Sequence, residues 1–351
     1  MKRVLIAMSG GVDSSVAAYL LREQGYECIG VTMKLYDNET AGQGYTCCSI
    51  DDIEDARSVA FRLGIPHHVF DFTEQFESKV IQKFVSAYEC GETPNPCIDC
   101  NRYMKFDLLL NRARQLGCDA VATGHYARIE RESGRWMLKK ALDTDKDQSY
   151  VLYAMTQEQL AHTLFPLGGL TKPQVRKIAE EQGFLNARKH DSQDICFVPD
   201  GDYVHFLERY TGKRYAEGAL LDEQGKVLGT HRGAAAYTIG QRRGLGLAMP
   251  HPVYVCRKCM RDNTVTVGPE QSLYSSELTA KDWNWVTAPA EHPFTASVKV
   301  RYRQQEQSAV VYPQEDGTVR IAFARVQRAV APGQAAVLYD GERVLGGGTI
   351  F

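Results

Sequence analysis

Short apolar runs alternate with helically spaced segments over the first part of the chain. The run RVLIAM, residues 3–8, is continuously apolar, and a helical pattern over 14–25 follows it and stops at a glycine. The alternation continues with strands predicted over 28–35, 67–72 and 120–125, and with helices predicted over 51–64, about 73–89 and about 104–117. This alternation predicts an α/β fold with a doubly wound parallel sheet, which binds ligands at the carboxyl ends of its strands.

The pattern changes after about residue 127. Residues 127–141 predict a hairpin that turns at Ser133 and Gly134, and residues 171–183 predict a helix with Thr171 as N-cap. After about residue 200, glycines become dense and short β-rich runs such as NTVTVGP and TVRIAFA dominate. We therefore expect an α/β domain over 1–200, a central small β-rich domain over 201–273 and a C-terminal β-barrel-like domain over 274–351.

Composition agrees with a multidomain globular protein. The chain has 351 residues, of which 44% are hydrophobic and 24% charged, and no apolar run approaches the roughly 20 residues of a membrane span. The N-terminal stretch lacks a cleavage-site pattern, so we expect a cytoplasmic protein without a membrane segment. The net charge of -2 argues against a uniformly basic nucleic-acid binder, but basic patches occur at 188–190, 242–243 and 299–303.

The first candidate site is the stretch SGGVDSS, residues 9–15, between a predicted strand and a predicted helix. Its backbone amides would form an anion site at the helix N-terminus, although a plain strand-to-helix turn could have the same glycines. The kinase-type pattern G-x-x-x-x-G-K-[ST] is absent, and Asp13 is present instead. A carboxylate beside an anion site is unfavourable unless a metal ion bridges it to the phosphates.

Cysteines supply the second candidate chemistry. The stretch TPNPCIDCN, residues 93–101, contains Cys97 and Cys100, whose spacing fits half of a zinc site, a redox dithiol or a single nucleophile. A zinc site would need the second pair, Cys256 and Cys259, which lies in a predicted β region with a different flank, so we expect that pair to be ordinary thiols. Cys196 lies in a polar segment just after the basic residues 188–190, whose charges would favour a thiolate.

The loop SGGVDS resembles the PP-loop of the ATP pyrophosphatase superfamily, whose members cleave ATP between the α- and β-phosphates to adenylate a carbonyl oxygen. Further motifs follow in order: TPNPCIDCNRYMKF, ATGHYAR, DQSYVLY, HDSQDICFV, YTIGQRRGLG, VRYRQ and APGQAAVLYD. With these motifs, the chain resembles the bacterial tRNA-specific 2-thiouridylases over essentially its whole length.

The resemblance implies an ATP-dependent sulfurtransferase. ATP, with Mg²⁺, would adenylate O2 of a wobble uridine in tRNA, and sulfur from a cysteine persulfide would then replace this oxygen at C2, giving 2-thiouridine, AMP and pyrophosphate. Cys100 would be the nucleophile and Cys196 the persulfide carrier, and the two could close a disulfide late in the cycle. The implied partners are a tRNA with a wobble uridine and a persulfide sulfur-donor protein.

The resemblance also assigns binding residues. For ATP they are Ala7, Met8, Ser9, Gly10, Gly11, Val12, Asp13, Ser14, Met33 and Gly124. For tRNA they are Asn95, Pro96, Cys97, His125, Lys146, Asp147, Gln148, Arg301, Tyr302 and Gln334. From the residues alone, core packing is the better interpretation of Met33, His125 could be a core histidine, and Arg301 and Tyr302 could equally lie on a solvated face.

Other hypotheses stay open at this point. Some family members have an aspartate, discussed as an acid/base, where this chain has Cys97. Cys97, Cys100 and Cys196 could together ligate an iron–sulfur cluster, which is possible but not favoured. A PP-loop ligase that adenylates another carbonyl substrate would need no reactive cysteine. An iron–sulfur RNA-binding protein would leave Asp13 and the glycine loop unexplained.

Overall fold

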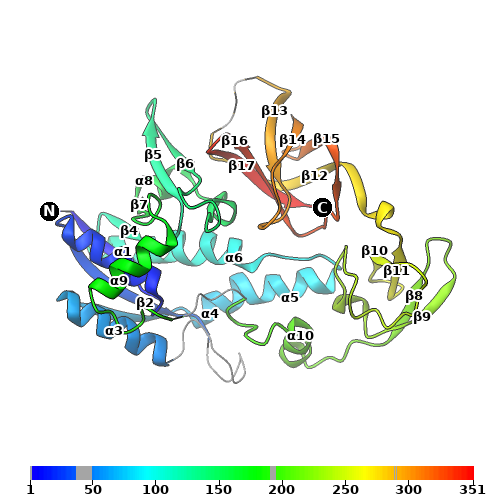
Figure 1. Ribbon diagram of the computed structural model, residues 1–351, viewed down its shortest axis with the longest axis horizontal. Coiled ribbons are helices and arrows are strands. Elements are labelled where there is room, and N and C mark those ends of the chain that lie inside the picture. Colours follow the sequence, from blue (N-terminus) through cyan, green and yellow to red (C-terminus); the bar gives the residue numbers. More distant parts are fainter. Residues whose placement is uncertain (1, 37–49, 190–194, 288, 290) are drawn as a thin grey trace.

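The computed structural model describes residues 2–36, 50–189, 195–287, 289 and 291–351. Its elements form a parallel α/β part at one end of the long axis, a small β sheet at the other end and a β barrel beside them (Figure 1). None of the described helices is both long enough and apolar enough to cross a bilayer.

The α/β part is built on a parallel sheet with the strand order β3-β2-β1-β4-β7. The central strand β1 (Arg3–Ala7) pairs with β2 (Glu27–Lys34) on one side and with β4 (Ala120–Ala122) on the other. The outer strands are β3 (His67–Asp71) and β7 (Thr163–Leu164). The strand order therefore reverses between β1 and β4, and the loop after β1 lies at this switch point, where doubly wound sheets bind ligands.

Helices cover both faces of this sheet because alternate strand residues point to opposite faces. Val4 and Ile6 pack against α1 (Val12–Glu23), α3 (Ile50–Leu63) and α9 (Lys172–Glu181). Leu5 faces the other side, where the core includes residues of α4 (Thr73–Phe76), α5 (Gln82–Glu89), α7 (Leu109–Gln115) and α10 (Tyr203–Thr211). The short α8 (Gln157–Ala161) precedes β7. The predicted doubly wound sheet is confirmed.

Two of the helices in the structure differ from those predicted from the sequence, one in its geometry and one in where it begins. The helix expected over about 73–89 is present but contains a π-helical turn, Glu77–Ile81. The helix expected to begin near residue 104 instead begins at Pro96, and comprises α6 (Pro96–Asp99), a π-helical segment Cys100–Leu108, and α7. We call this whole run, residues 96–115, the cysteine helix. It begins early because Oδ1 of Asn95 accepts a hydrogen bond from the amide of Cys97 at 3.2 Å and proline suits the first helical position.

The β-rich regions form two further sheets. The predicted hairpin is confirmed as β5 (Arg128–Glu132) and β6 (Arg135–Lys139). The small sheet has the order β10-β11-β8-β9, with β8 (Gly218–Leu221), β9 (Val227–His231), β10 (Tyr254–Cys259) and β11 (Thr264–Gly268).

The barrel has the order β12-β15-β14-β13-β16-β17 and closes because β12 pairs with both β15 and β17. Val298, Val311, Ile321 and Leu338 are buried in its core. The predicted β-rich central and barrel-like C-terminal folds are therefore confirmed, whereas the boundaries at 200 and 273 stay predictions. The strands of the barrel are β12 (Tyr274–Trp285), β13 (Phe294–Lys299), β14 (Gln307–Pro313), β15 (Val319–Arg328), β16 (Ala335–Asp340) and β17 (Arg343–Ile350).

Candidate active site

The loop between β1 and α1 is fixed by bonds from its own side chains and from a distant asparagine. Oγ of Ser14 accepts from the amide of Ser9 at 3.2 Å and donates to the carbonyl of Gly11 at 3.0 Å. Nδ2 of the buried Asn186 donates to the carbonyl of Gly10 at 2.9 Å. The loop is thereby held at the N-terminus of α1, where backbone amides and the helix dipole favour a phosphate.

At two positions around the phosphate loop, another segment of backbone lies so close that only glycine fits. Gly10 has a φ of 73°, and a Cβ there would lie 2.4 Å from the carbonyl oxygen of Asp52. Gly124 follows β4, and a Cβ there would lie 2.7 Å from the backbone nitrogen of Ser14. Any other residue at either position would displace the loop, because real Cβ atoms do not approach backbone this closely.

Asp13 has protein partners that the sequence did not reveal. Nζ of Lys172 donates to both carboxylate oxygens at 2.8 Å, and the hydroxyl of Tyr126 donates to Oδ1 at 2.7 Å. Lys172 is the first residue of α9 and is 7% exposed. From the sequence we expected a metal ion to compensate this carboxylate, but the chain itself supplies a cation. Lys172 lies 159 positions after Asp13, so no sequence spacing could have linked them.

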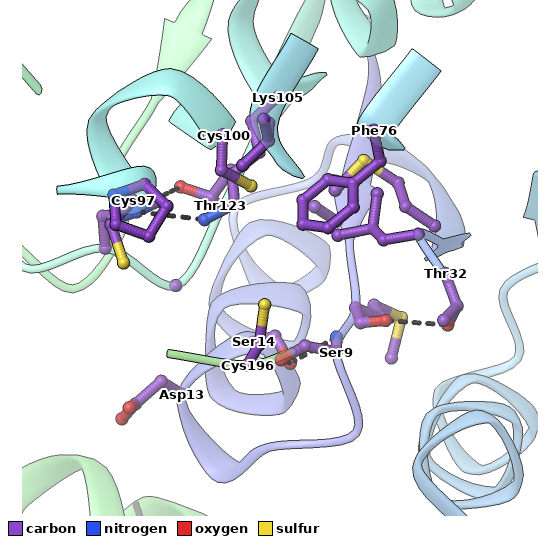
Figure 2. Close-up of a pocket in the computed structure, with 18 of the residues that line it drawn as sticks. Ser9, Asp13, Ser14, Thr32, Phe76, Cys97, Cys100, Lys105, Thr123 and Cys196 are labelled. Atoms are coloured by element: carbon purple, nitrogen blue, oxygen red, sulfur yellow. Dashed lines mark hydrogen bonds between the residues drawn. The ribbon is translucent and has the colours of Figure 1, made fainter. Parts of the chain in front are cut away.

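A cavity of about 320 Å³ lies at the carboxyl ends of β1, β2 and β4 (Figure 2). Its walls combine the phosphate loop with the cysteine helix and the segment around Cys196, so both predicted reactive cysteines line one cavity. The other wall is apolar and includes Val31, Leu35 and Phe76. The predicted residues that line this cavity are Ala7, Met8, Ser9, Asp13, Ser14, Met33, Pro96, Cys97, Cys100, Gly124, His125, Gln148 and Cys196.

Cys196 is anchored on both sides of its α-carbon. Its carbonyl accepts a hydrogen bond from the hydroxyl of Tyr36 at 2.9 Å. The next residue, Phe197, is fully buried and packs edge-to-face on Phe76 and Phe84, with ring centroids 5.8 and 5.1 Å apart. These contacts hold the thiol at the cavity although Cys196 lies outside regular secondary structure.

The basic residues before Cys196 have other partners. Nζ of Lys189 lies 2.7 Å from Asp52 and 2.6 Å from Asp55 on α3. The Arg188 side chain is 92% exposed, and its Nε lies 3.7 Å from Glu180. Arg188 and Lys189 therefore have acidic partners of their own, and our expectation that their charges favour a thiolate at Cys196 stays a prediction; His190 lies outside the described residues. Each of the two charges is attracted to an acidic side chain of a neighbouring helix instead.

A lysine and a histidine complete the cavity wall beside the cysteine helix. Lys105 and His125 both line the cavity, and Nζ of Lys105 lies 3.5 Å from Nε2 of His125. Nδ1 of His125 lies 2.7 Å from Oγ1 of Thr123. Burial, together with the charge of Lys105, lowers the pKa of His125 well below its ordinary value, so the imidazole is neutral at pH 7. Lys105 is not among the site residues predicted from the sequence.

The remaining predicted tRNA residues divide between a second cavity and the interior. A larger groove of about 990 Å³ is lined by Lys146, Asp147, Gln148 and Tyr302, and also by Gly11 and Val12 of the phosphate loop. Because Ser9, Asp13 and Gln148 line both cavities, the two adjoin.

Three predicted tRNA residues lie outside both cavity linings: Asn95, which caps the cysteine helix, Arg301 and Gln334. Nη2 of Arg301 donates to the carbonyls of Ile239 and Ala329 at 3.0 Å, and burial lowers the pKa of the guanidinium. Nε2 of Gln334 donates to the carbonyl of Thr93 at 2.6 Å. The tRNA contacts of these residues stay predictions. The side chains of Arg301 and Gln334 already make hydrogen bonds that hold the domains together.

The second cysteine pair, Cys256 and Cys259, makes contacts within the small β sheet. Sγ of Cys256 donates to the carbonyl of Tyr254 at 3.2 Å, and Sγ of Cys259 lies 3.2 Å from Oδ2 of Asp262. Within the described ranges, no group of three or more His, Cys, Asp or Glu side chains is placed to hold a metal ion.

Fold and cavity together place the chain in the class of α/β enzymes that bind a nucleotide at a phosphate loop and carry cysteines beside it. Three family models match the chain: "tRNA methyl transferase HUP domain" over residues 2–200, "tRNA methyl transferase PRC-barrel domain" over 204–269 and "Aminomethyltransferase beta-barrel domain" over 275–350.

Curated relatives identify the family. The tRNA-specific 2-thiouridylase MnmA of Geotalea uraniireducens is 52% identical over 99% of this chain and 95% of the relative. The enzymes of the same name from Acetivibrio thermocellus and Symbiobacterium thermophilum are each 51% identical over 99% of this chain, and over 99% and 92% of their own lengths. The chain belongs to the family of tRNA-specific 2-thiouridylases.

Among solved structures, a 4-thiouridine synthetase–RNA complex with bound ATP is 19% identical, with a TM-score of 0.39, over 59% of this chain and 50% of that chain. A likeness at this level supports no statement about ligands.

Proposed function

We propose that the chain is an ATP-dependent tRNA sulfurtransferase that converts a wobble uridine to 2-thiouridine. The observation that carries the proposal is the single cavity that joins the phosphate loop to Cys100 and Cys196. An adenylating loop alone would suit any PP-loop ligase, but such a ligase would not need two cysteines facing its nucleotide site. The family assignment agrees with this choice.

The phosphate loop would bind the triphosphate through its backbone amides at the N-terminus of α1. The apolar wall formed by Val31, Leu35 and Phe76 offers a site for the adenine ring. Bound in this way, the α-phosphate lies near the switch point, and a uridine flipped out of the anticodon loop can present O2 to it. Attack by O2 on the α-phosphate gives an adenylated uridine and releases pyrophosphate.

Asp13 fits a role beside Mg²⁺. Magnesium in nucleotide sites is held by one or two carboxylates and the substrate phosphates, and Asp13 lines both cavities next to the loop. When bound, the ion would neutralise phosphate charge. In its absence, Lys172 and Tyr126 hold the carboxylate in place.

Sulfur transfer would use the two cysteines in either of two routes. In one, the terminal sulfur of a Cys196 persulfide attacks C2 and expels AMP, and the Cys100 thiolate then attacks Sγ of Cys196 and frees the thiocarbonyl. In the other, Cys100 attacks Sγ of Cys196 first and releases hydrosulfide, which attacks C2. Both routes oxidise the two thiols to a Cys100–Cys196 disulfide, which an external thiol must reduce. A persulfide sulfur-donor protein would reload Cys196.

The description of the matching domain model names methyl transfer. Methyl transfer requires a methyl donor, and cleavage of ATP between its α- and β-phosphates does not supply one. The phosphate loop and the thiols in one cavity therefore favour the reaction named by the curated relatives.

The proposal is tested by nucleoside mass spectrometry of unmodified tRNA incubated with the protein, ATP, Mg²⁺, a persulfide donor and a thiol reductant. We expect 2-thiouridine with the wild type and none with Cys100→Ser or Cys196→Ser. Cys90→Ser is the matched control, because Cys90 is exposed and lines neither cavity. Release of AMP without thiolated tRNA, unchanged in the Cys100 and Cys196 variants, would support a ligase for another carbonyl substrate instead.

A further inference from the structure

The cysteine helix changes its geometry at Cys100. Residues Cys100–Leu108 form a π-helical segment, in which backbone bonds join residue i to residue i+5. In an α-helix, a residue five positions further on is rotated by roughly 140° and points away from the first. In the π-helical segment it lies about one turn above the first residue. Lys105 therefore lies above Cys100, and both side chains line the cavity (Figure 2).

Lys105 is the only lysine or arginine among the described residues that line this cavity. The other titratable groups in the lining are Asp13, His125 and three cysteines, Cys97, Cys100 and Cys196. Asp13 is paired with Lys172, so its charge is already compensated. An ammonium in a confined cavity favours anionic partners, and the thiolates are the anions that the protein itself can provide there.

Lys105 contacts His125, which in turn contacts Thr123. An ammonium group has only N–H donors, so Nε2 of His125 must accept from Nζ of Lys105 across the 3.5 Å between them. Nδ1 then carries the ring proton and donates to Oγ1 of Thr123 at 2.7 Å. Phe106 and Phe165 pack against the imidazole with ring centroids 5.9 and 5.8 Å away, and His125 is 7% exposed. This burial keeps the imidazole neutral and fixed.

We propose that Lys105 holds Cys100 as a thiolate for sulfur transfer, and that His125 is a positioning residue that orients Lys105 through the Thr123–His125–Lys105 chain. The inference rests on the proposed function and adds a charged group to its sulfur-transfer step. It also gives His125 a role in the protein alone, separate from the tRNA contact that the family resemblance implies.

The test measures how fast iodoacetamide alkylates Cys100 in the full-length protein, without ATP or tRNA, from pH 5 to 10, with the Cys100 peptide followed by mass spectrometry. For Lys105→Met we expect about tenfold slower alkylation at pH 7 and a midpoint about one pH unit higher, because the thiolate loses its neighbouring cation. Lys105→Arg should retain most of the wild-type rate. Lys79→Met is the control, because Lys79 is an exposed lysine outside the cavity lining.

Two histidine variants test the positioning role. His125→Gln keeps an acceptor for Nζ of Lys105 and should stay near the wild-type profile, whereas His125→Phe cannot accept and should behave like Lys105→Met. If His125→Phe weakens tRNA binding but leaves the alkylation profile unchanged, the positioning role is wrong. If Lys105→Met, with a wild-type circular dichroism spectrum, leaves the profile unchanged, the whole inference is overturned.

The alkylation result is independent of the proposed function. A protein that failed to form 2-thiouridine could still show the Lys105-dependent profile, and the inference about Cys100 would then stand while the function fell. Conversely, 2-thiouridine formation at the wild-type rate by Lys105→Met would contradict the inference and leave the function intact.

Discussion

The pair formed by Lys172 and Asp13 permits a quantitative prediction at the phosphate loop. We consider Lys172→Met, which keeps the side-chain length and removes the charge. Both Nζ–carboxylate distances are 2.8 Å, which corresponds to an attraction of about 6 kcal/mol at an effective dielectric constant of about 20. The cost of removing the charges from water offsets much of this attraction, because the Lys172 side chain is 9% exposed and that of Asp13 is 30% exposed.

Loss of one partner from a fully buried pair costs about 3–5 kcal/mol. Asp13 remains partly hydrated and keeps its bond from Tyr126, so we expect Lys172→Met to lower the free energy of unfolding by about 2 kcal/mol. The uncompensated carboxylate should also repel the phosphates of ATP and weaken binding by about tenfold or more. The double variant Asp13→Asn with Lys172→Met removes both charges, so it should recover stability to within about 1 kcal/mol of the wild type.

Urea unfolding followed by circular dichroism, together with ATP titration by calorimetry, completes the double-mutant cycle. The ion pair between Arg22 and Glu23 is a matched surface control, because both side chains are about half exposed. Loss of this pair should lower the free energy of unfolding by well under 1 kcal/mol. The reasoning is refuted if Lys172→Met is as stable as the wild type and binds ATP equally well. The reasoning is also refuted if the double variant is no more stable to urea than Lys172→Met alone.

Three other predictions follow from single contacts. Gly124→Ala should displace Ser14 and reduce adenylation, measured as pyrophosphate release, by about 100-fold with little loss of helicity; full activity would show that the close approach is not required. His125 has a lowered pKa, so below about pH 6.5 the unfolded chain takes up a proton that the folded chain does not, and stability decreases as the pH falls; His125→Gln should remove up to about 2 kcal/mol of the loss between pH 7 and 5 in urea unfolding. Arg301→Met should lower the melting temperature of the free protein, because two carbonyls lose their donor; a change in tRNA affinity alone would favour the predicted tRNA contact.

The sequence predicted the parallel sheet well because its strands are short apolar runs and its helices have clear periodicity. It misplaced the start of the cysteine helix, which was predicted near residue 104, because Asn95 caps the helix and makes Pro96 its first residue. The thiols and the phosphate loop were found because their residue types are chemically distinctive. Lys172 and Lys105 were missed because their roles depend on a long-range contact and on a π-helical turn, and neither leaves a local pattern.

Two hydrogen bonds join the C-terminal barrel to the segment before the cysteine helix, so the barrel cannot be exchanged independently of that segment. The amide of Thr93 donates to the carbonyl of Pro332 at 2.8 Å, and Gln334 donates back to the carbonyl of Thr93, two residues before the cap of the cysteine helix. The barrel therefore acts as a template for the start of the helix that presents Cys97 and Cys100. A chimera that exchanges the barrel between relatives should keep its activity only if residues 93–95 and 332–334 come from the same parent.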